Sequence, residues 1–141
     1  MNLKQDSHMH NETGFDEMRF VRQIRYHRLG AIGQQKLSEA HAAIVGCGAL
    51  GSTTAMSLTR AGIGRLTIID RDVPEWSNLP RQFLFTEKDV CDGLPKAIIA
   101  EKRLKEIDRN VQVIPHVRDL SAHNISDLLS SVDVIVDGTD N

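Results

Sequence analysis

The hydrophobic pattern divides the chain into a polar start, a stretch of helical periodicity and a long alternation of strand and helix patterns. Residues 1–14 are polar and without periodicity, and they cannot bury enough surface to offset their ordering entropy, so we predict a disordered tail there. Apolar positions at helical spacing predict a helix over residues 15–29, and a second short helix is predicted over 34–40. Residues 15–40 are therefore expected to be N-terminal helices that precede the main domain.

From residue 41 to residue 141 the pattern alternates between buried strands and helices. Strands are predicted at 41–46, 65–70, 111–117 and 132–136, with helices at 50–61, at 96–108 and from Ser121 or Asn124. This alternation is typical of an α/β fold, and we expect an incomplete nucleotide-binding domain with a Rossmann-like, mostly parallel sheet and crossover helices. In the helix over 96–108, the residues expected to face water are Lys102, Arg103, Lys105 and Glu106. The long segment 71–93 is predicted to be mostly irregular and functional.

A glycine-rich loop, GCGALG at residues 46–51, follows the first strand of this domain and opens the next helix. It matches the G-x-G-x-x-G pattern, in which glycines let the backbone approach a phosphate and the helix start offers free N–H groups. The loop residues expected to contact a nucleotide are Gly46, Gly48, Ala49, Leu50 and Gly51. Asp70 ends the next strand, where a carboxylate accepts hydrogen bonds from ribose hydroxyls. Cys47 is interpreted as a small apolar residue of the loop and not as a nucleophile.

Basic residues later in the chain favour ATP over a dinucleotide. A triphosphate needs Arg, Lys and a divalent ion, whereas a dinucleotide pyrophosphate rests mainly on the helix start. Arg81 and Lys96 lie in or beside segments that fold over the carboxyl ends of the strands, so we expect them to bind phosphate. Asp140 follows the last strand at the same edge, and it is expected to hold Mg²⁺ and not merely to cap a helix.

The composition limits the number of domains, the partners and the cellular location that we expect. A chain of 141 residues with 40% apolar content suits one domain, and a net charge of −2 gives no global reason to bind nucleic acid or an anionic membrane. Its two cysteines have neither metal-ligand nor disulfide-scaffold spacing, and no apolar run approaches the roughly 20 residues of a membrane span. We therefore expect a cytoplasmic protein with no nucleic-acid or membrane partner.

Ordered motifs over residues 19–141 resemble those of the ThiF/MoeB/HesA adenylyltransferases, the bacterial relatives of ubiquitin-activating enzymes. The resemblance rests on RFVRQ at residues 19–23, the glycine loop, DRD at 70–72, SNLPRQ at 77–82, LPK at 94–96 and DGTDN at 137–141. It departs at Ala49, where a second glycine is common, and at Pro80, where glutamine is usual.

The resemblance implies an activity, partners and residue roles. The implied reaction is ATP-dependent adenylation of the C-terminal glycine of a ubiquitin-like sulfur carrier, in thiamine or molybdenum-cofactor synthesis, by a homodimer. Nucleotide contacts are implied for Asp70, Asp72, Asn78, Arg81 and Lys96, and Mg²⁺ binding for Asp140. Arg22 is implied to reach the triphosphate of the partner subunit, so the implied catalytic residues are Arg22, Arg81, Lys96 and Asp140.

Two other interpretations remain open from the sequence. The glycine loop with Asp70 also permits an NAD-dependent oxidoreductase domain, although Arg81, Lys96 and Asp140 favour a triphosphate. A catalytically inactive nucleotide-binding fragment is the other, because the family continues beyond this chain with a carrier-binding half. Structural zinc, which cysteine pairs bind in many members, is expected only in that half.

Overall fold

The computed structural model describes residues 18–140, which form an α/β fold around one sheet. The four strands are β1 (His41–Val45), β2 (Arg65–Ile69), β3 (Gln112–His116) and β4 (Val134–Asp137). They pair in parallel in the order β3-β2-β1-β4, which confirms the predicted Rossmann-like parallel sheet. The predicted tail, residues 1–14, lies outside the described residues, and the division into a tail, N-terminal helices and a nucleotide-binding domain stays a prediction.

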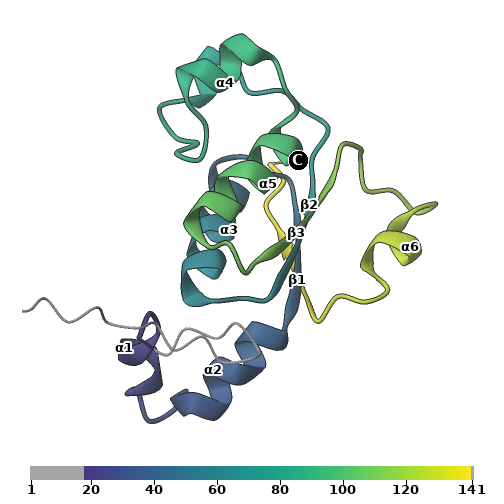
Figure 1. Cartoon of the computed structure of the whole chain (residues 1–141). Helices are drawn as coiled ribbons and strands as arrows, with labels where there is room; N and C mark the ends of the chain where they lie inside the picture. The colour runs from purple at the N-terminus through teal and green to yellow at the C-terminus, as the bar shows by residue number, and fades with distance from the viewer. Residues whose placement is uncertain (1–17, 141) are drawn as a thin grey trace, which may run out of the picture.

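Helices cover the two faces of the sheet unequally. The helices α3 (Ala49–Ala61) and α5 (Lys96–Ile107) pack on one face, and the short α6 (Ile125–Leu129) lies on the other (Figure 1). The chain steps outward from β1 to β2 to β3 and then returns past β1 to β4, so a right-handed crossover places α6 on the opposite face. The connections diverge between β1 and β4, and open α/β sheets bind ligands at such a point, beyond the carboxyl ends of the strands.

The burial of the central strands in the core explains why they could be predicted from the sequence. Ile44 of β1 and Leu66 and Ile68 of β2 are fully buried, and they pack with Ala55 of α3 and Leu104 of α5. Strands of a parallel sheet that are buried on both faces read as nearly continuous apolar runs.

The predicted helices and strands of the domain are confirmed, with small shifts at their ends. The helix α3 ends at Gly62, whose φ of +90° is the left-handed conformation that stops a helix. The last strand, predicted at 132–136, is Val134–Asp137. No helix between residues 18 and 140 is long and apolar enough to span a lipid bilayer.

The prediction of one helix over residues 15–29 is wrong for the part that the structure describes. Only α1 (Val21–Ile24) is helical there, and turns follow it. The next helix, α2 (Gly30–Glu39), begins earlier than the predicted 34–40. Gly30 has a φ of +62°, which separates the two helices. Gln34 is fully buried and donates a hydrogen bond to the Ala61 carbonyl at 2.8 Å, so a distant contact holds α2 in place.

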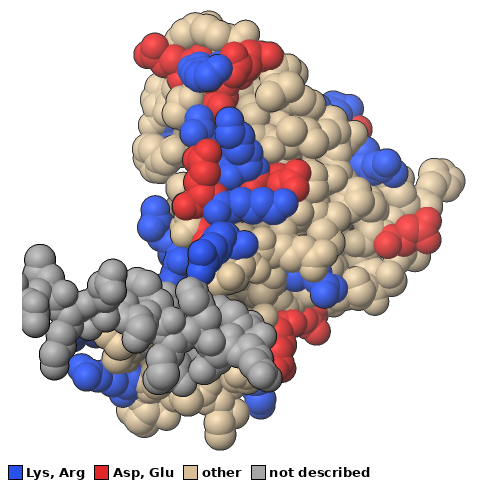
Figure 2. Space-filling model, in the orientation of Figure 1, with Lys and Arg blue, Asp and Glu red and all other residues tan. Residues whose placement is uncertain are grey.

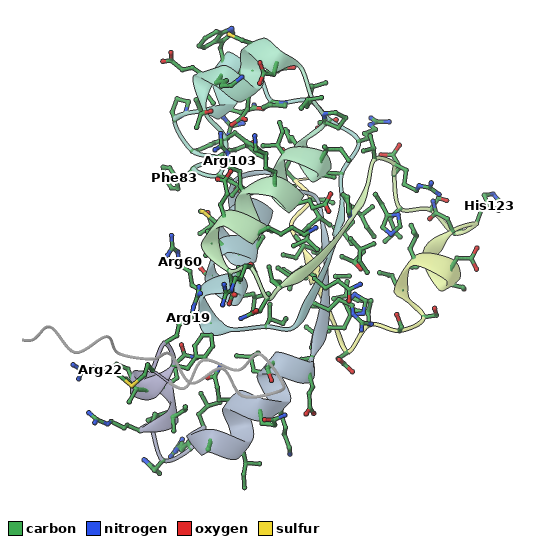
Figure 3. All side chains as sticks on the ribbon, viewed as in Figure 1. Arg19, Arg22, Arg60, Phe83, Arg103 and His123 are labelled. Atoms are coloured by element: carbon green, nitrogen blue, oxygen red, sulfur yellow. The ribbon has the colours of Figure 1, made fainter. Side chains whose placement is uncertain are left out.

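The segment 71–93 is more regular than predicted. It contains the 3₁₀ helix η1 (Trp76–Asn78) and the helix α4 (Glu87–Asp92), each opened by a capping box. Arg103 was expected to face water, but it reaches from α5 to the Asp89 carboxylate at 3.0 Å, as its place between α5 and α4 in Figure 3 illustrates. Asp89 also accepts hydrogen bonds from the Thr86 backbone and hydroxyl. This cluster fastens α4 to α5 above the sheet.

The Asp89 cluster predicts a pH-dependent contribution to stability. Burial of Asp89 opposes ionisation, but hydrogen bonds from Thr86 and Arg103 outweigh it and hold the pKa of this carboxyl below its ordinary value. A lowered folded-state pKa means that the stabilisation is complete above the unfolded pKa and is lost as the pH falls through the folded value. We expect Asp89→Asn to lower the free energy of unfolding by about 1–2 kcal/mol at pH 7.

The measurement is urea unfolding of both chains at pH 7 and below pH 4. The difference should shrink only as the pH falls through the lowered folded-state pKa of Asp89, where the carboxylate itself becomes neutral. The control is Asp92→Asn, because within the described part of the chain Asp92 pairs with the exposed Lys88 of the same short helix and with no other side chain. An Asp89→Asn effect that is equal at both pH values would contradict the ionised cap.

Candidate functional site

A cleft of about 930 Å³ opens beyond the carboxyl ends of the strands. Its volume lies within the range of pockets that bind cofactors and drug-sized ligands. Most of the predicted site residues line it: Gly46, Gly48, Ala49, Leu50, Asp70, Asp72, Asn78, Arg81, Lys96 and Asp140. Gly51 and Arg22, also predicted as site residues, do not line the cleft.

Close backbone packing shapes the glycine loop at the base of the cleft. Gly46 has a φ of +84°, and its N–H donates to the Ile69 carbonyl at 2.8 Å. A Cβ on Gly51 would overlap the Gly46 carbonyl oxygen, and one on Gly138 would lie 2.8 Å from the same atom. Gly51 thus supports the site without lining the cleft, because its missing side chain lets the glycine loop pack against the start of α3.

Asp70 joins the glycine loop to the end of β2. One carboxylate oxygen accepts the Cys47 N–H at 2.6 Å, and the other accepts the Asp72 N–H at 2.7 Å. A carboxylate has about four acceptor positions, so two remain for a ligand. The structure therefore gives Asp70 a loop-bracing role that the sequence did not suggest, and it leaves room for the predicted ribose contact.

Lys96 places a buried cation in the cleft wall at the start of α5. Only 6% of the residue is exposed, and Nζ lies 3.6 Å from an Asp72 carboxylate oxygen. The Lys96 N–H donates to the Asp72 carbonyl at 2.8 Å, which ties the start of α5 to the loop after β2. A lysine this buried is rare unless it is paired, so Lys96 is not the solvated surface charge that its position in the sequence allowed.

The 3₁₀ helix η1 and the turn after it bring three further polar side chains to the cleft. The Asn78 side-chain oxygen accepts the Glu75 N–H at 3.0 Å, which holds η1. Among the described residues, the Asn78 amide nitrogen has a single, long contact of 3.5 Å, to Ser77. Arg81 donates to the Ser77 carbonyl at 2.8 Å. Gln82 is 4% exposed, and its Oε1 has no hydrogen-bond partner among residues 18–140. A buried amide oxygen of this kind is usually satisfied by a ligand or a water molecule.

Sequence reasoning missed several charged residues of the cleft. Arg71 and Asp119 form an ion pair at 2.8 Å, and Arg118 lies beside them. The sequence did contain a signal for them, because Arg71, Arg118 and Asp119 lie directly after predicted strands, near the same edge of the sheet as Asp70. The cleft thus mixes Arg71, Arg81, Lys96 and Arg118 with Asp70, Asp72, Glu75, Asp119 and Asp140. Cations and carboxylates also alternate over the face that carries α4 and α5 (Figure 2).

Asp140 is the cleft residue predicted to hold a divalent cation. It follows Asp137, whose carboxylate accepts hydrogen bonds from the Thr139 N–H and hydroxyl. These bonds lower the pKa of Asp137 and shape the turn that brings Asp140 into the cleft. Within residues 18–140, no group of three or more His, Cys, Asp or Glu side chains forms a ready-made metal site. Mg²⁺ commonly needs only one or two protein carboxylates when substrate phosphates and water complete its shell, so Asp140 fits this kind of ion.

Arg22 lies apart from the cleft. It is on α1, at the end of the molecule opposite the chain's C-terminal end (Figure 3, with the C-terminus marked in Figure 1). Its side chain is exposed and is absent from the cleft lining of its own chain.

Cys47 is predicted to be chemically inert. Burial, and to a smaller extent the neighbouring Asp70 carboxylate, raise the pKa of Cys47 to about 12, against a smaller opposing effect of Lys96. The thiol therefore stays protonated at pH 8, whereas Cys91 is exposed. We expect iodoacetamide to label the folded chain at Cys91 alone, and mass spectrometry to find both cysteines labelled after denaturation. Labelling of a folded Cys91→Ser variant at Cys47 would refute this expectation.

Proteins similar to this chain include named adenylyltransferases. The chain is 49% identical over 123 residues to the sulfur carrier protein ThiS adenylyltransferase of Bacillus subtilis, covering 87% of this chain and 37% of that protein. It is 41% identical to the adenylyltransferase and sulfurtransferase MOCS3 of Danio rerio, covering 89% of this chain and 27% of that protein. The chain thus spans only about a third of the length of these relatives.

A solved structure shares the fold. The tRNA N6-threonylcarbamoyladenosine dehydratase TcdA of E. coli, in complex with ATP, superimposes with a TM-score of 0.81 at 29% identity, covering 89% of this chain and 50% of that chain. The ThiF family matches residues 20–141, which include every segment of the cleft. We conclude that the chain belongs to the ThiF family.

Proposed function

We propose that the cleft binds Mg·ATP and that the protein adenylates the C-terminal glycine of a ubiquitin-like sulfur carrier. The observation that carries this proposal is the buried Lys96 cation, which faces a glycine loop in a cleft that also holds Arg81. A triphosphate needs such cations, and a hydride-transfer site does not. The names of the B. subtilis and D. rerio relatives support the reaction, and the ATP complex of TcdA supports the nucleotide.

Each cleft segment has a proposed part in holding ATP. The phosphates lie on the glycine loop and the start of α3, where free N–H groups point outward, and Lys96 and Arg81 neutralise their charge. The Asn78 amide nitrogen donates to a phosphate oxygen, since it is nearly without a partner inside η1. Asp70 uses its two remaining acceptor positions for the ribose hydroxyls. Asp140 binds Mg²⁺, which when bound neutralises charge on the phosphates.

The proposed chemistry requires no nucleophile from the protein. A carboxylate oxygen of the carrier's terminal glycine attacks the α-phosphorus, a new P–O bond forms, and the bond to the bridging oxygen breaks as pyrophosphate leaves with the electron pair. Cys47 takes no part, because its thiol stays protonated. Lys96 and Arg81 stabilise the charge that builds on the departing pyrophosphate, and the cleft holds the two reactants in line.

The test is calorimetric titration of the chain with Mg·ATP and, separately, with NAD. We expect ATP to bind and NAD not to bind, and Arg81→Ala to weaken ATP binding about tenfold, as for the loss of one charged hydrogen bond. Lys105→Ala is the control, because Lys105 pairs with Glu101 on the exposed side of α5. ATP–pyrophosphate exchange with candidate carriers then identifies the substrate. Preference for NAD would replace the proposal with an oxidoreductase domain, and binding of neither by a folded chain would favour an inactive fragment.

Arg22 has a proposed role in a homodimer. It lies away from the cleft of its own chain, so the proposed contact with a triphosphate would have to be made in the cleft of a second copy. We expect Arg22→Ala to lower pyrophosphate exchange in the complete protein without lowering its melting temperature. Mixing Arg22→Ala subunits with Asp140→Ala subunits should restore part of the activity, because one of the two sites in a mixed dimer is then intact. Activity no higher than that of either variant alone would refute action across the interface.

A further inference from the structure

The strand order gives the proposed nucleotide a direction across the sheet. Along the edge of the sheet, the carboxyl ends of the strands lie in the spatial order β3, β2, β1, β4. In the proposed function, on which this inference rests, the phosphates lie at the loop after β1 and the ribose lies at Asp70, after β2. Continuing in the same direction leads to the loop after β3, where Arg118, Asp119 and Leu120 line the cleft. The nucleobase of a bound nucleotide therefore meets this loop.

Two side chains from other segments hold the loop after β3. Arg71, which directly follows Asp70, donates from Nη1 to an Asp119 carboxylate oxygen at 2.8 Å. From the other side, the Asn124 amide donates to the Asp119 carbonyl at 2.9 Å, and the Asn124 side-chain oxygen accepts the Ser121 N–H at 2.8 Å. The side chain and the carbonyl of Asp119 are thus fastened to different segments.

The Arg71–Asp119 ion pair is poorly placed to stabilise the fold. The side chains of Arg71 and Asp119 are 68% and 62% exposed, and ion pairs this exposed contribute little to stability. The pair does link the loop after β2, which holds the proposed ribose contact, to the loop after β3. Ordering a loop before a ligand arrives lowers the entropy cost of binding.

We infer that Arg71 is a positioning residue that acts through Asp119 to hold the loop of residues 118–120 as the wall for the nucleobase. Leu120 then offers that wall an apolar contact for the base, while the phosphates depend on the glycine loop, Arg81 and Lys96. Loss of Arg71 should consequently affect a ligand that has a base and spare a ligand that has only phosphates.

The experiment compares Mg·ATP with magnesium inorganic triphosphate on the full chain, by calorimetry. We expect Arg71→Ala to weaken ATP binding about fivefold, the size of one exposed contact, and to leave triphosphate binding and the melting temperature unchanged. Asp119→Ala should have the same effect, and the double variant should be no worse than either single variant, since both break the Arg71–Asp119 link. The other ion pair of Arg71, with Asp72 at 3.8 Å, is longer and exposed on both sides, so its loss is expected to contribute little. Arg71→Lys should recover part of the loss because it keeps the charge.

Arg65→Ala is the matched control. Arg65 bridges the same two strands at their opposite ends, where its Nε donates to the Gln112 side chain at 3.1 Å, and the variant should bind ATP as the wild type does. Equal weakening of ATP and triphosphate by Arg71→Ala would overturn the inference and make Arg71 a phosphate contact. No weakening of either ligand would also overturn it. A wild-type chain that binds neither ligand would instead refute the proposed function, and this inference with it.

Discussion

Replacing Gly51 by alanine is expected to lower the free energy of unfolding by about 3 kcal/mol or more, the upper range for forcing atoms into a packed interior. A Cβ at this position would overlap the Gly46 carbonyl oxygen and lie 3.1 Å from the Ile44 side chain. Neither neighbour can move easily. The Gly46 N–H is bonded to Ile69 in β2, and Ile44 is fully buried in β1.

The control for Gly51→Ala lies in the same loop. Gly48 has no positive φ, and a Cβ there would meet only the Gln82 amide nitrogen, at 3.8 Å. Gly48→Ala should therefore unfold at nearly the same urea concentration as the wild type. If Gly51→Ala unfolded there too, the tight packing of the loop against α3 would be refuted. Nucleotide binding is a separate measurement, because Gly48 lines the cleft.

Removing the charge of Lys96 should have the largest effect on the proposed reaction. Lys96→Met keeps most of the buried aliphatic stem and removes the ammonium group that we propose binds the phosphates. We expect the pyrophosphate-exchange rate of the complete protein to fall about 10²–10³-fold, the usual effect of deleting one group that stabilises charge in a transition state. The loss of the contact with Asp72 should cost little stability, since Asp72 is 59% exposed and can be hydrated.

Lys105→Met provides the matched comparison for Lys96→Met. Both lysines lie on α5, but Lys105 pairs with Glu101 at 2.6 Å on the outer side of the helix. The Lys105 variant should exchange pyrophosphate at the wild-type rate. If Lys96→Met also retained full exchange while remaining folded, the assignment of a phosphate role to Lys96 would be wrong, whatever nucleotide the cleft binds.

The candidate site shows which functional residues local sequence patterns can predict and which they cannot. GCGALG, Asp70 and Lys96 were found because each stands next to the end of a strand or the start of a helix, and the carboxyl ends of parallel strands meet at one edge. The same rule pointed to Arg118 and Asp119, which were overlooked. Their pairing with Arg71 was not predictable, because 48 residues separate Arg71 from Asp119 and no local period connects them.

The sequence by itself determined the order of strands and helices from residue 41 onward and the glycine loop, since these depend on apolar periodicity and on turns that only glycine can make. The tertiary structure alone decided how α2 is held in place, how Arg103 pairs with Asp89 to hold α4, and how deeply Lys96 is buried. Each of these depends on a partner elsewhere in the chain: Ala61 for α2, Asp89 for Arg103, and the loop of Asp72 for Lys96. Burial and ion pairing arise between segments, so a pattern within one segment cannot specify them.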